Sequence, residues 1–99
     1  MNNWVLNEGE RLDDLVRGDM KIIQRPDQFC LSLDSILAAH YVSIRKKDRI
    51  ADLGTGTGVI ALLLSTLGGE DITAFEINPV MADLARRNVN GNNKSDCIK

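Results

Sequence analysis

The sequence predicts an α/β fold built on a parallel sheet, and three observations predict it. A short strand is expected over residues 49–53, and the glycine-rich loop Gly54-Thr55-Gly56-Thr57-Gly58 follows it directly. The next segment, residues 59–67, is almost wholly apolar, as a buried helix is. A second strand rich in β-branched and aromatic residues is expected over residues 71–75, with a further helix after it. Strand, loop, helix, strand, helix is the order of the first half of a Rossmann-like, doubly wound fold.

A lead-in segment, residues 1–45, is expected to precede this unit, which occupies residues 46–99. The lead-in is predicted to start irregularly and then to form a hairpin between residues 21–24 and residues 29–31. Arg25-Pro26-Asp27-Gln28 would form the turn, because proline fixes φ and aspartate can hydrogen-bond to its own backbone.

The lead-in is expected to close with a helix that begins at Ser32 or Asp34. Ile36 and Tyr41 would lie on one apolar face of that helix. Trp4 is expected to anchor the lead-in to the rest of the domain, since a large aromatic side chain stabilises best by burial.

The last predicted helix has clear start and stop signals. Asn78 is a good N-cap, Pro79 suits the first helical position, and Gly91 is expected to end the helix. Residues 96–99 look like the start of a third strand. The apolar face of the helix is expected to contain residues at helical spacing: Met81, Leu84, Ala85 and Val89.

Composition excludes several classes of protein. Hydrophobic residues make up 43% and charged residues 26%, which is ordinary globular composition, and the net charge of −2 argues against a general nucleic-acid-coating protein. No basic segment followed by an apolar run suggests a signal peptide, and no apolar stretch is long enough to span a bilayer. Cys30, Cys97 and His40 lack the spacing of a disulfide framework or a metal site. A reduced, cytoplasmic chain without a membrane partner is therefore expected.

The glycine-rich loop and two carboxylates form the strongest candidate site. Glycines let a backbone turn sharply and let a ligand approach bare main chain, and the GxGxG spacing differs from the GxGxxG of dinucleotide-binding folds. Glu76, at the end of the second strand, can accept hydrogen bonds from both hydroxyls of a ribose, which S-adenosylmethionine (SAM) and NAD share. Asp52 favours SAM, because SAM carries a cationic amino group and no phosphates, whereas an acid there would repel a pyrophosphate.

The loop and the two acids resemble the first two motifs of class I SAM-dependent methyltransferases. Upstream, Glu10–Leu15, Ile22–Gln24 and Phe29–Ala39 resemble the lead-in of one branch, the tRNA1(Val) adenine-amino methyltransferase group with its small methyltransferase domain. The resemblance covers nearly the whole chain. It implies SAM as the cofactor and the amino-terminal half of a Rossmann-like methyltransferase fold.

The resemblance also implies individual roles. The loop would surround the methionine part of SAM, Glu76 would hold the ribose, and Ile77 would lie against the adenine. Phe29 and Asp34 lie in the segment that closes over the cofactor in such enzymes, although core packing and helix capping explain them equally well. The cofactor-binding residues expected are Asp52, Gly54, Thr55, Gly56, Gly58, Glu76, Ile77, Phe29 and Asp34.

The catalytic motif of the resembled family, Asn/Asp-Pro-Pro-aromatic after the fourth strand, is not found. Asn78-Pro79-Val80 lacks the second proline and the aromatic, and it is better explained as a helix cap. No catalytic residue is therefore assigned. The expectation is that more chain exists, that the complete enzyme methylates the exocyclic amino group of an adenine in tRNA, and that these 99 residues bind SAM without turnover.

Several functions stay open beside this one. The target could be another amino group, in a ribosomal RNA guanine or a protein glutamine, and these enzymes share the same loop. A non-catalytic SAM-binding module is a second possibility, and a nicotinamide oxidoreductase is a third, disfavoured by the loop spacing and by Asp52. The predicted partners are tRNA or another RNA. A partial sheet also leaves an uncovered edge, through which the chain is expected to self-associate.

Overall fold

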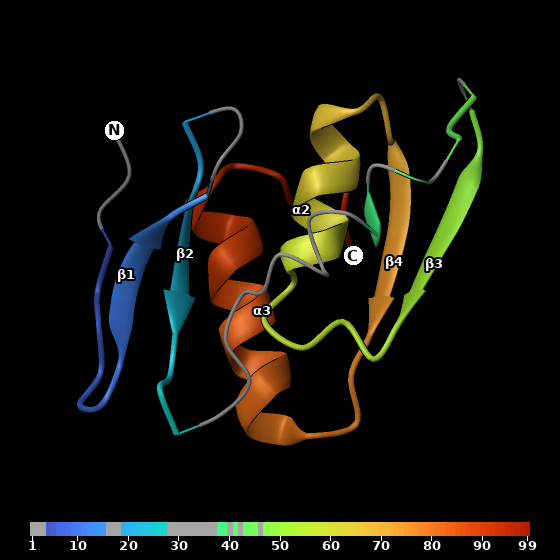
Figure 1. Ribbon diagram of the computed structural model, residues 1–99. Helices are drawn as coiled ribbons and strands as arrows, with labels where there is room; N and C mark the ends of the chain where they lie inside the picture. Colours follow the sequence, from blue (N-terminus) through green and yellow to red (C-terminus); the bar gives the residue numbers. More distant parts are fainter. Residues whose placement is uncertain (1–3, 16–18, 28–37, 40, 42, 46) are drawn as a thin grey trace.

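The computed structural model describes residues 4–15, 19–27, 38–39, 41, 43–45 and 47–99. Two helices lie between a two-stranded antiparallel hairpin on one side and a parallel strand pair on the other (Figure 1). The elements in chain order are β1 (Arg11–Asp14), β2 (Lys21–Gln24), β3 (Arg49–Leu53), α2 (Val59–Thr66), β4 (Asp71–Phe75) and α3 (Pro79–Gly91).

The parallel half agrees closely with the prediction from the sequence. β3 and β4 have the predicted bounds and pair in parallel, with Arg49 opposite Asp71 and Leu53 opposite Phe75. The chain after α3 adds to the other edge of β4 through a parallel bridge between Ile72 and Ile98. The Ile72 N–H donates to the Cys97 carbonyl at 2.8 Å. In the described part of this sheet, β4 therefore lies between β3 and residues 97–99. This is the third strand whose start the sequence predicts.

Helix α2 is buried because it has partners on two sides. Val59 and Leu62–Leu64 are buried, with Leu62 and Leu63 fully so. One core cluster contains these side chains together with Ile72 of β4 and Ile22 of β2. A helix that is apolar all round is expected only where both faces are covered, and this cluster includes side chains of both β4 and the hairpin.

Helix α3 begins where the sequence predicts. The Asn78 side chain accepts hydrogen bonds from the backbone N–H groups of Val80, at 2.9 Å, and Met81, and Pro79 occupies the first turn. This cap satisfies two of the donors that a helix start leaves unpaired. The predicted apolar face of Met81, Leu84, Ala85 and Val89 is buried, and Asn88 is buried with it.

The structure describes a hairpin that the sequence did not predict, formed by β1 and β2. β2 pairs with β1, upstream. The pairing predicted for β2, with residues 29–31, stays a prediction, because those residues lie outside the described residues. The Leu15 N–H closes the turn by donating to the Met20 carbonyl at 2.8 Å. The sequence did not predict β1, because Arg11-Leu12-Asp13-Asp14 has little β-propensity. Cross-strand contacts, such as the 2.6 Å ion pair between Lys21 and Asp14, support the strand.

Part of the predicted lead-in helix is described, since residues 38–39 and 41 are helical. Ala39 is fully buried, whereas Tyr41 is 87% exposed, so Tyr41 was wrongly placed on a buried face. The predicted start at Ser32 or Asp34, and Ile36, lie outside the described residues.

Trp4 anchors the start of the chain to α3, as the sequence predicts. It packs against the cluster of Ile23, Met81 and Leu84. Its ring also lies over Gly91, where a Cβ would come within 2.3 Å of the indole. The absence of a side chain at Gly91 is therefore a packing requirement as well as a helix-end signal.

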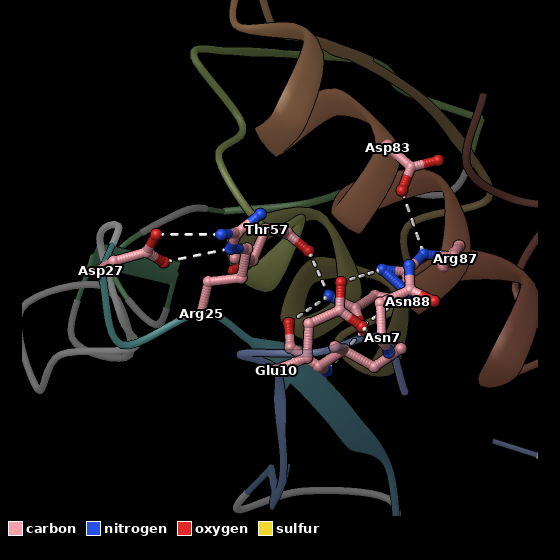
Figure 2. Close-up of polar contacts among 9 residues, drawn as sticks. Asn7, Glu10, Arg25, Asp27, Thr57, Asp83, Arg87 and Asn88 are labelled. Carbon is pink, nitrogen blue, oxygen red and sulfur yellow. Dashed lines mark hydrogen bonds and ion pairs between the residues drawn. The ribbon is translucent and has the colours of Figure 1, made fainter. Parts of the chain in front are cut away.

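A charged cluster ties the same segment to α3. The Glu10 side chain is only 4% exposed and forms a bidentate pair with the Arg87 guanidinium, one arm of which is a 2.8 Å bond from Nη1 to Oε1 (Figure 2). Arg87 also donates to Asp83 at 3.1 Å, and the Asn7 N–H donates to Glu10 at 2.8 Å. A nearly buried carboxylate is tolerated because its oxygens are satisfied in this way.

Candidate cofactor-binding site

The loop between β3 and α2 depends on its glycines. Gly54, Gly56 and Gly58 all have positive φ, of 67°, 59° and 88°, a region that other residues adopt only with strain. Gly58 is also the N-cap of α2, and a Cβ there would contact Ala85 of α3 at 3.5 Å. The three glycines of the GxGxG loop thus occupy three left-handed backbone positions, and Gly58 also lies where the start of α2 approaches α3 closely.

Hydrogen bonds hold the first part of the loop to both strands. The Thr55 N–H donates to the carbonyl of Phe75, at the end of β4, at 2.9 Å. The Thr55 hydroxyl donates to Asp52 Oδ2 at 2.7 Å, and the Gly58 N–H closes a turn onto the Thr55 carbonyl at 2.9 Å. Asp52 is half-buried, and this hydroxyl fixes its carboxylate beside the loop.

Glu76 faces the loop across the ends of the two strands. Its Oε1 accepts the Gly56 N–H at 2.8 Å, and its Oε2 accepts the Asn78 N–H at 3.0 Å. An ionised carboxylate has about four acceptor positions, so about two stay available. The backbone therefore orients Glu76 without using up its capacity to accept hydroxyl donors.

A groove of about 390 Å³ lies at the carboxyl ends of β3 and β4. Its lining combines Gly54 and the Glu76 carboxylate with three exposed apolar side chains: Leu53, Phe75 and Ile77. Ile77 is 98% exposed, and together with Leu53 and Phe75 it forms an exposed apolar patch of the kind that marks ligand-binding grooves and interaction surfaces. In open α/β sheets, ligands bind outside the carboxyl ends of the strands, which is where this groove lies.

A second cavity of about 230 Å³ shares Thr55, Gly58 and Glu76 with this region. Residues of α3 and of the segment from Ser95 to Lys99 complete its lining. The Glu76 carboxylate thus lies at the junction of an open groove and a cavity beneath α3.

The structure brings together most of the residues that the sequence predicts, namely Asp52, Gly54, Thr55, Gly56, Gly58, Glu76 and Ile77. Phe29 and Asp34 lie outside the described residues and stay predictions. Among the described residues there is no group of three His, Cys, Asp or Glu side chains suited to a metal ion. In the same part of the chain, no helix has the length and apolar character needed to cross a bilayer.

Sequence reasoning missed Asn88, which contacts the loop from behind. Its Nδ2 donates to the Thr57 carbonyl at 2.9 Å, and both residues are buried. One signal could have found it: Asn88 occupies an apolar position in the pattern of α3, and a polar residue at such a position needs partners inside the fold.

Comparison with known proteins identifies the family. Residues 28–99 match the family model described as ribosomal protein L11 methyltransferase (PrmA). The chain belongs to the PrmA family. Among curated members, the ribosomal protein L11 methyltransferase of Bacillus velezensis is 38% identical over 53 residues, which are 54% of this chain and 17% of that protein. That of Carboxydothermus hydrogenoformans is 41% identical over 49 residues, 50% of this chain and 16% of that protein.

A solved structure has the same fold. The Pyrococcus abyssi tRNA (uracil-54, C5)-methyltransferase, in complex with S-adenosyl-L-homocysteine, superposes with a TM-score of 0.69 at 23% identity. The match covers 95% of this chain and 24% of that protein. The predicted Rossmann-like methyltransferase fold is thereby confirmed.

The PrmA family also confirms two coarser predictions, a class I methyltransferase and SAM as its cofactor. The narrower resemblance to the tRNA1(Val) adenine branch stays a prediction, because the matching family is named for a ribosomal protein. This chain spans about 17% of the length of the first curated relatives it matches.

Proposed function

We propose that this chain is the cofactor-binding part of a SAM-dependent methyltransferase, with SAM held in the groove between the glycine loop and Glu76. The observation that carries the proposal is the Glu76 carboxylate, oriented by the Gly56 and Asn78 N–H groups with acceptor positions still available. Residues 46–99 would form the cofactor-binding domain, and residues 1–45 a lead-in docked on α3.

The residues of the groove suit the chemical groups of SAM. The two ribose hydroxyls need an acceptor that can take two donors, and Glu76 has that capacity. The cationic amino group needs a nearby anion, and Asp52 is held beside the loop by Thr55. The adenine needs an apolar surface, which exposed Ile77 offers.

When bound, SAM supplies a methyl group on a sulfonium, which is already electrophilic. The chain contributes binding and orientation: Glu76 fixes the ribose, Asp52 fixes the amino group, and the loop backbone sets the depth of the groove. Positioning of this kind supplies much of the rate acceleration in group transfer. None of these residues holds a methyl acceptor, so we propose that the 99 residues alone bind SAM without turnover.

For the acceptor we propose an amino group of a protein, because the curated relatives are named ribosomal protein L11 methyltransferases. The amino group of an adenine in tRNA, expected from the lead-in resemblance, is the second candidate. The amino group of a ribosomal RNA guanine is a further candidate, whereas a protein glutamine is one form of the first. A SAM-binding module without catalysis is the alternative that needs no acceptor.

An acceptor assay tests the proposed lack of turnover. The chain is incubated with methyl-labelled SAM and with purified ribosomal protein L11 or bulk tRNA, and label in each acceptor is counted. We expect bound label on the chain and none in either acceptor. Label in L11 or in tRNA would contradict the proposed lack of turnover, and it would identify the acceptor directly.

We also propose that the chain self-associates through β3. Among the described residues, β3 pairs only with β4, and its Ala51 and Leu53 side chains are exposed. An unpaired strand edge with exposed apolar residues is a template for pairing. Sedimentation velocity should show a concentration-dependent dimer, and Ala51→Lys should shift it toward monomer because an edge charge opposes pairing. A chain that stays monomeric across the concentration series would contradict this proposal.

A further inference from the structure

Asn88 is the fully buried polar residue of α3, and its side chain makes three hydrogen bonds. Its Oδ1 accepts the Ile23 N–H at 2.6 Å, while its Nδ2 donates to the Ile23 carbonyl at 3.1 Å. The same Nδ2 also donates to the Thr57 carbonyl at 2.9 Å (Figure 2). Both amide donors are therefore used. One side chain joins the hairpin strand β2 to the glycine loop.

Asn92, the C-cap residue that follows α3, makes the same pair of contacts with Lys21. Its Oδ1 accepts the Lys21 N–H at 2.9 Å, and its Nδ2 donates to the Lys21 carbonyl at 2.6 Å. Four helical residues rise about 6 Å and two strand residues about 6.7 Å, so two asparagines at this spacing can occupy the edge of a strand. The two side chains act in place of a neighbouring strand for β2.

The two asparagines differ in one contact. The second acceptor of the Asn92 amide is the Asn88 backbone carbonyl, at 2.8 Å, within α3 itself. The second acceptor of the Asn88 amide is Thr57, at the centre of the loop. Asn92 therefore joins the hairpin to α3 alone, whereas Asn88 also joins it to the cofactor loop.

The contact at Thr57 completes the fixation of the loop. Phe75 holds Thr55, Glu76 holds Gly56, and Asn88 holds Thr57. Without the Asn88 amide, the Thr57 carbonyl would lose its side-chain donor inside a buried region, and a buried polar group without a partner is costly. The loop would be expected to move so that this carbonyl finds another donor.

We propose that Asn88 is a positioning residue that couples the lead-in hairpin to the cofactor loop, so that docking of the hairpin and occupation of the cofactor site stabilise each other. The inference rests on the proposed function, because it takes the loop to be part of the SAM site. The coupling is reciprocal: whatever docking of the hairpin adds to cofactor affinity, cofactor binding adds to docking of the hairpin.

The test compares Asn88→Ala with Asn92→Ala, which loses the same kind of strand contact but none to the loop. S-adenosylhomocysteine affinity is measured by calorimetry for each folded variant. Amide hydrogen exchange is measured at Leu15, whose N–H bonds to the Met20 carbonyl and touches neither asparagine. Removing one buried hydrogen bond predicts an affinity about fivefold or more weaker in Asn88→Ala, and close to unchanged in Asn92→Ala.

Exchange gives a readout that a merely structural role would not change. In the unmodified chain, S-adenosylhomocysteine should slow exchange at Leu15, which lies in the hairpin and not in the groove. Asn88→Ala should abolish this ligand-dependent slowing, and Asn92→Ala should retain it.

Three results would overturn the inference. Equal affinities in the two variants would remove the special role of Asn88, although the proposed function would stand. Ligand binding by the unmodified chain without slowing at Leu15 would do the same, and it does not depend on whether either variant folds. Absence of binding to the unmodified chain would overturn the proposed function itself, and the inference with it.

Discussion

Replacing Glu76 by glutamine is expected to weaken SAM binding about 10- to 100-fold, since hydrogen bonds to a charged group contribute about 1.5–3 kcal/mol. Glutamine has nearly the same shape and keeps one carbonyl oxygen for the Gly56 or the Asn78 N–H, whereas its NH2 group cannot accept the other N–H. The variant lacks the charge and the second acceptor oxygen that two ribose hydroxyls require. Isothermal titration calorimetry with SAM measures the difference directly.

Glu70→Gln is the matched control for this prediction. It removes the same charge from an exposed position before β4, away from the residues that line the groove. Its affinity for SAM should equal that of the unmodified chain. If Glu76→Gln also binds SAM with unchanged affinity while folding normally, the ribose is not held by Glu76 and the site lies elsewhere.

Replacing Gly91 by alanine is expected to destabilise the fold by about 2 kcal/mol, although alanine is the better helix former, because overpacking typically costs about 1–3 kcal/mol. The new Cβ would lie 2.3 Å from the Trp4 ring, and a rigid indole cannot give way as a flexible chain end can. Chemical denaturation followed by circular dichroism gives the change in the free energy of unfolding.

The sign of this effect should reverse when Trp4 is removed. In a Trp4→Ala background the same Gly91→Ala change should stabilise the chain by about 0.5–1 kcal/mol, the difference in helix propensity. The double-mutant cycle therefore isolates the contact between Trp4 and Gly91. If Gly91→Ala is destabilising in both backgrounds, the glycine is needed for its backbone and not for the ring above it.

The parallel half of the fold could be predicted because its signals are local. The apolar run from Val59, the Asn78-Pro79 start and the two short strands are each readable within about ten residues. β1 could not be read in this way. Asp13 and Asp14 favour a turn by composition. The strand is supported by its pairing with β2, in which Lys21 lies opposite Asp14 and Gln24 donates to Asp13, and only the folded chain reveals these contacts.

The candidate site likewise has features that the sequence predicts and features that only the fold reveals. The glycines and Glu76 could be identified because their residue types are dictated by backbone conformation and by hydroxyl recognition. The Gly56–Glu76 bond could not, since it requires β3 and β4 to be neighbours in register. Asn88 was hidden for a different reason: a single asparagine among apolar residues gives no indication, by sequence alone, of which backbone groups it will contact.

The most direct test of the proposed cofactor site is a calorimetric titration of SAM, S-adenosylhomocysteine and NAD into the folded chain. All three ligands carry an adenosine, so the comparison depends on the group attached to the 5′ carbon of its ribose. Asp52 beside the loop should accept the amino group of the first two and repel the pyrophosphate of the third. We predict saturable binding of SAM and S-adenosylhomocysteine and no binding of NAD. Binding of NAD, or no binding of either methyl-cycle ligand by a folded chain, would contradict the proposed cofactor site.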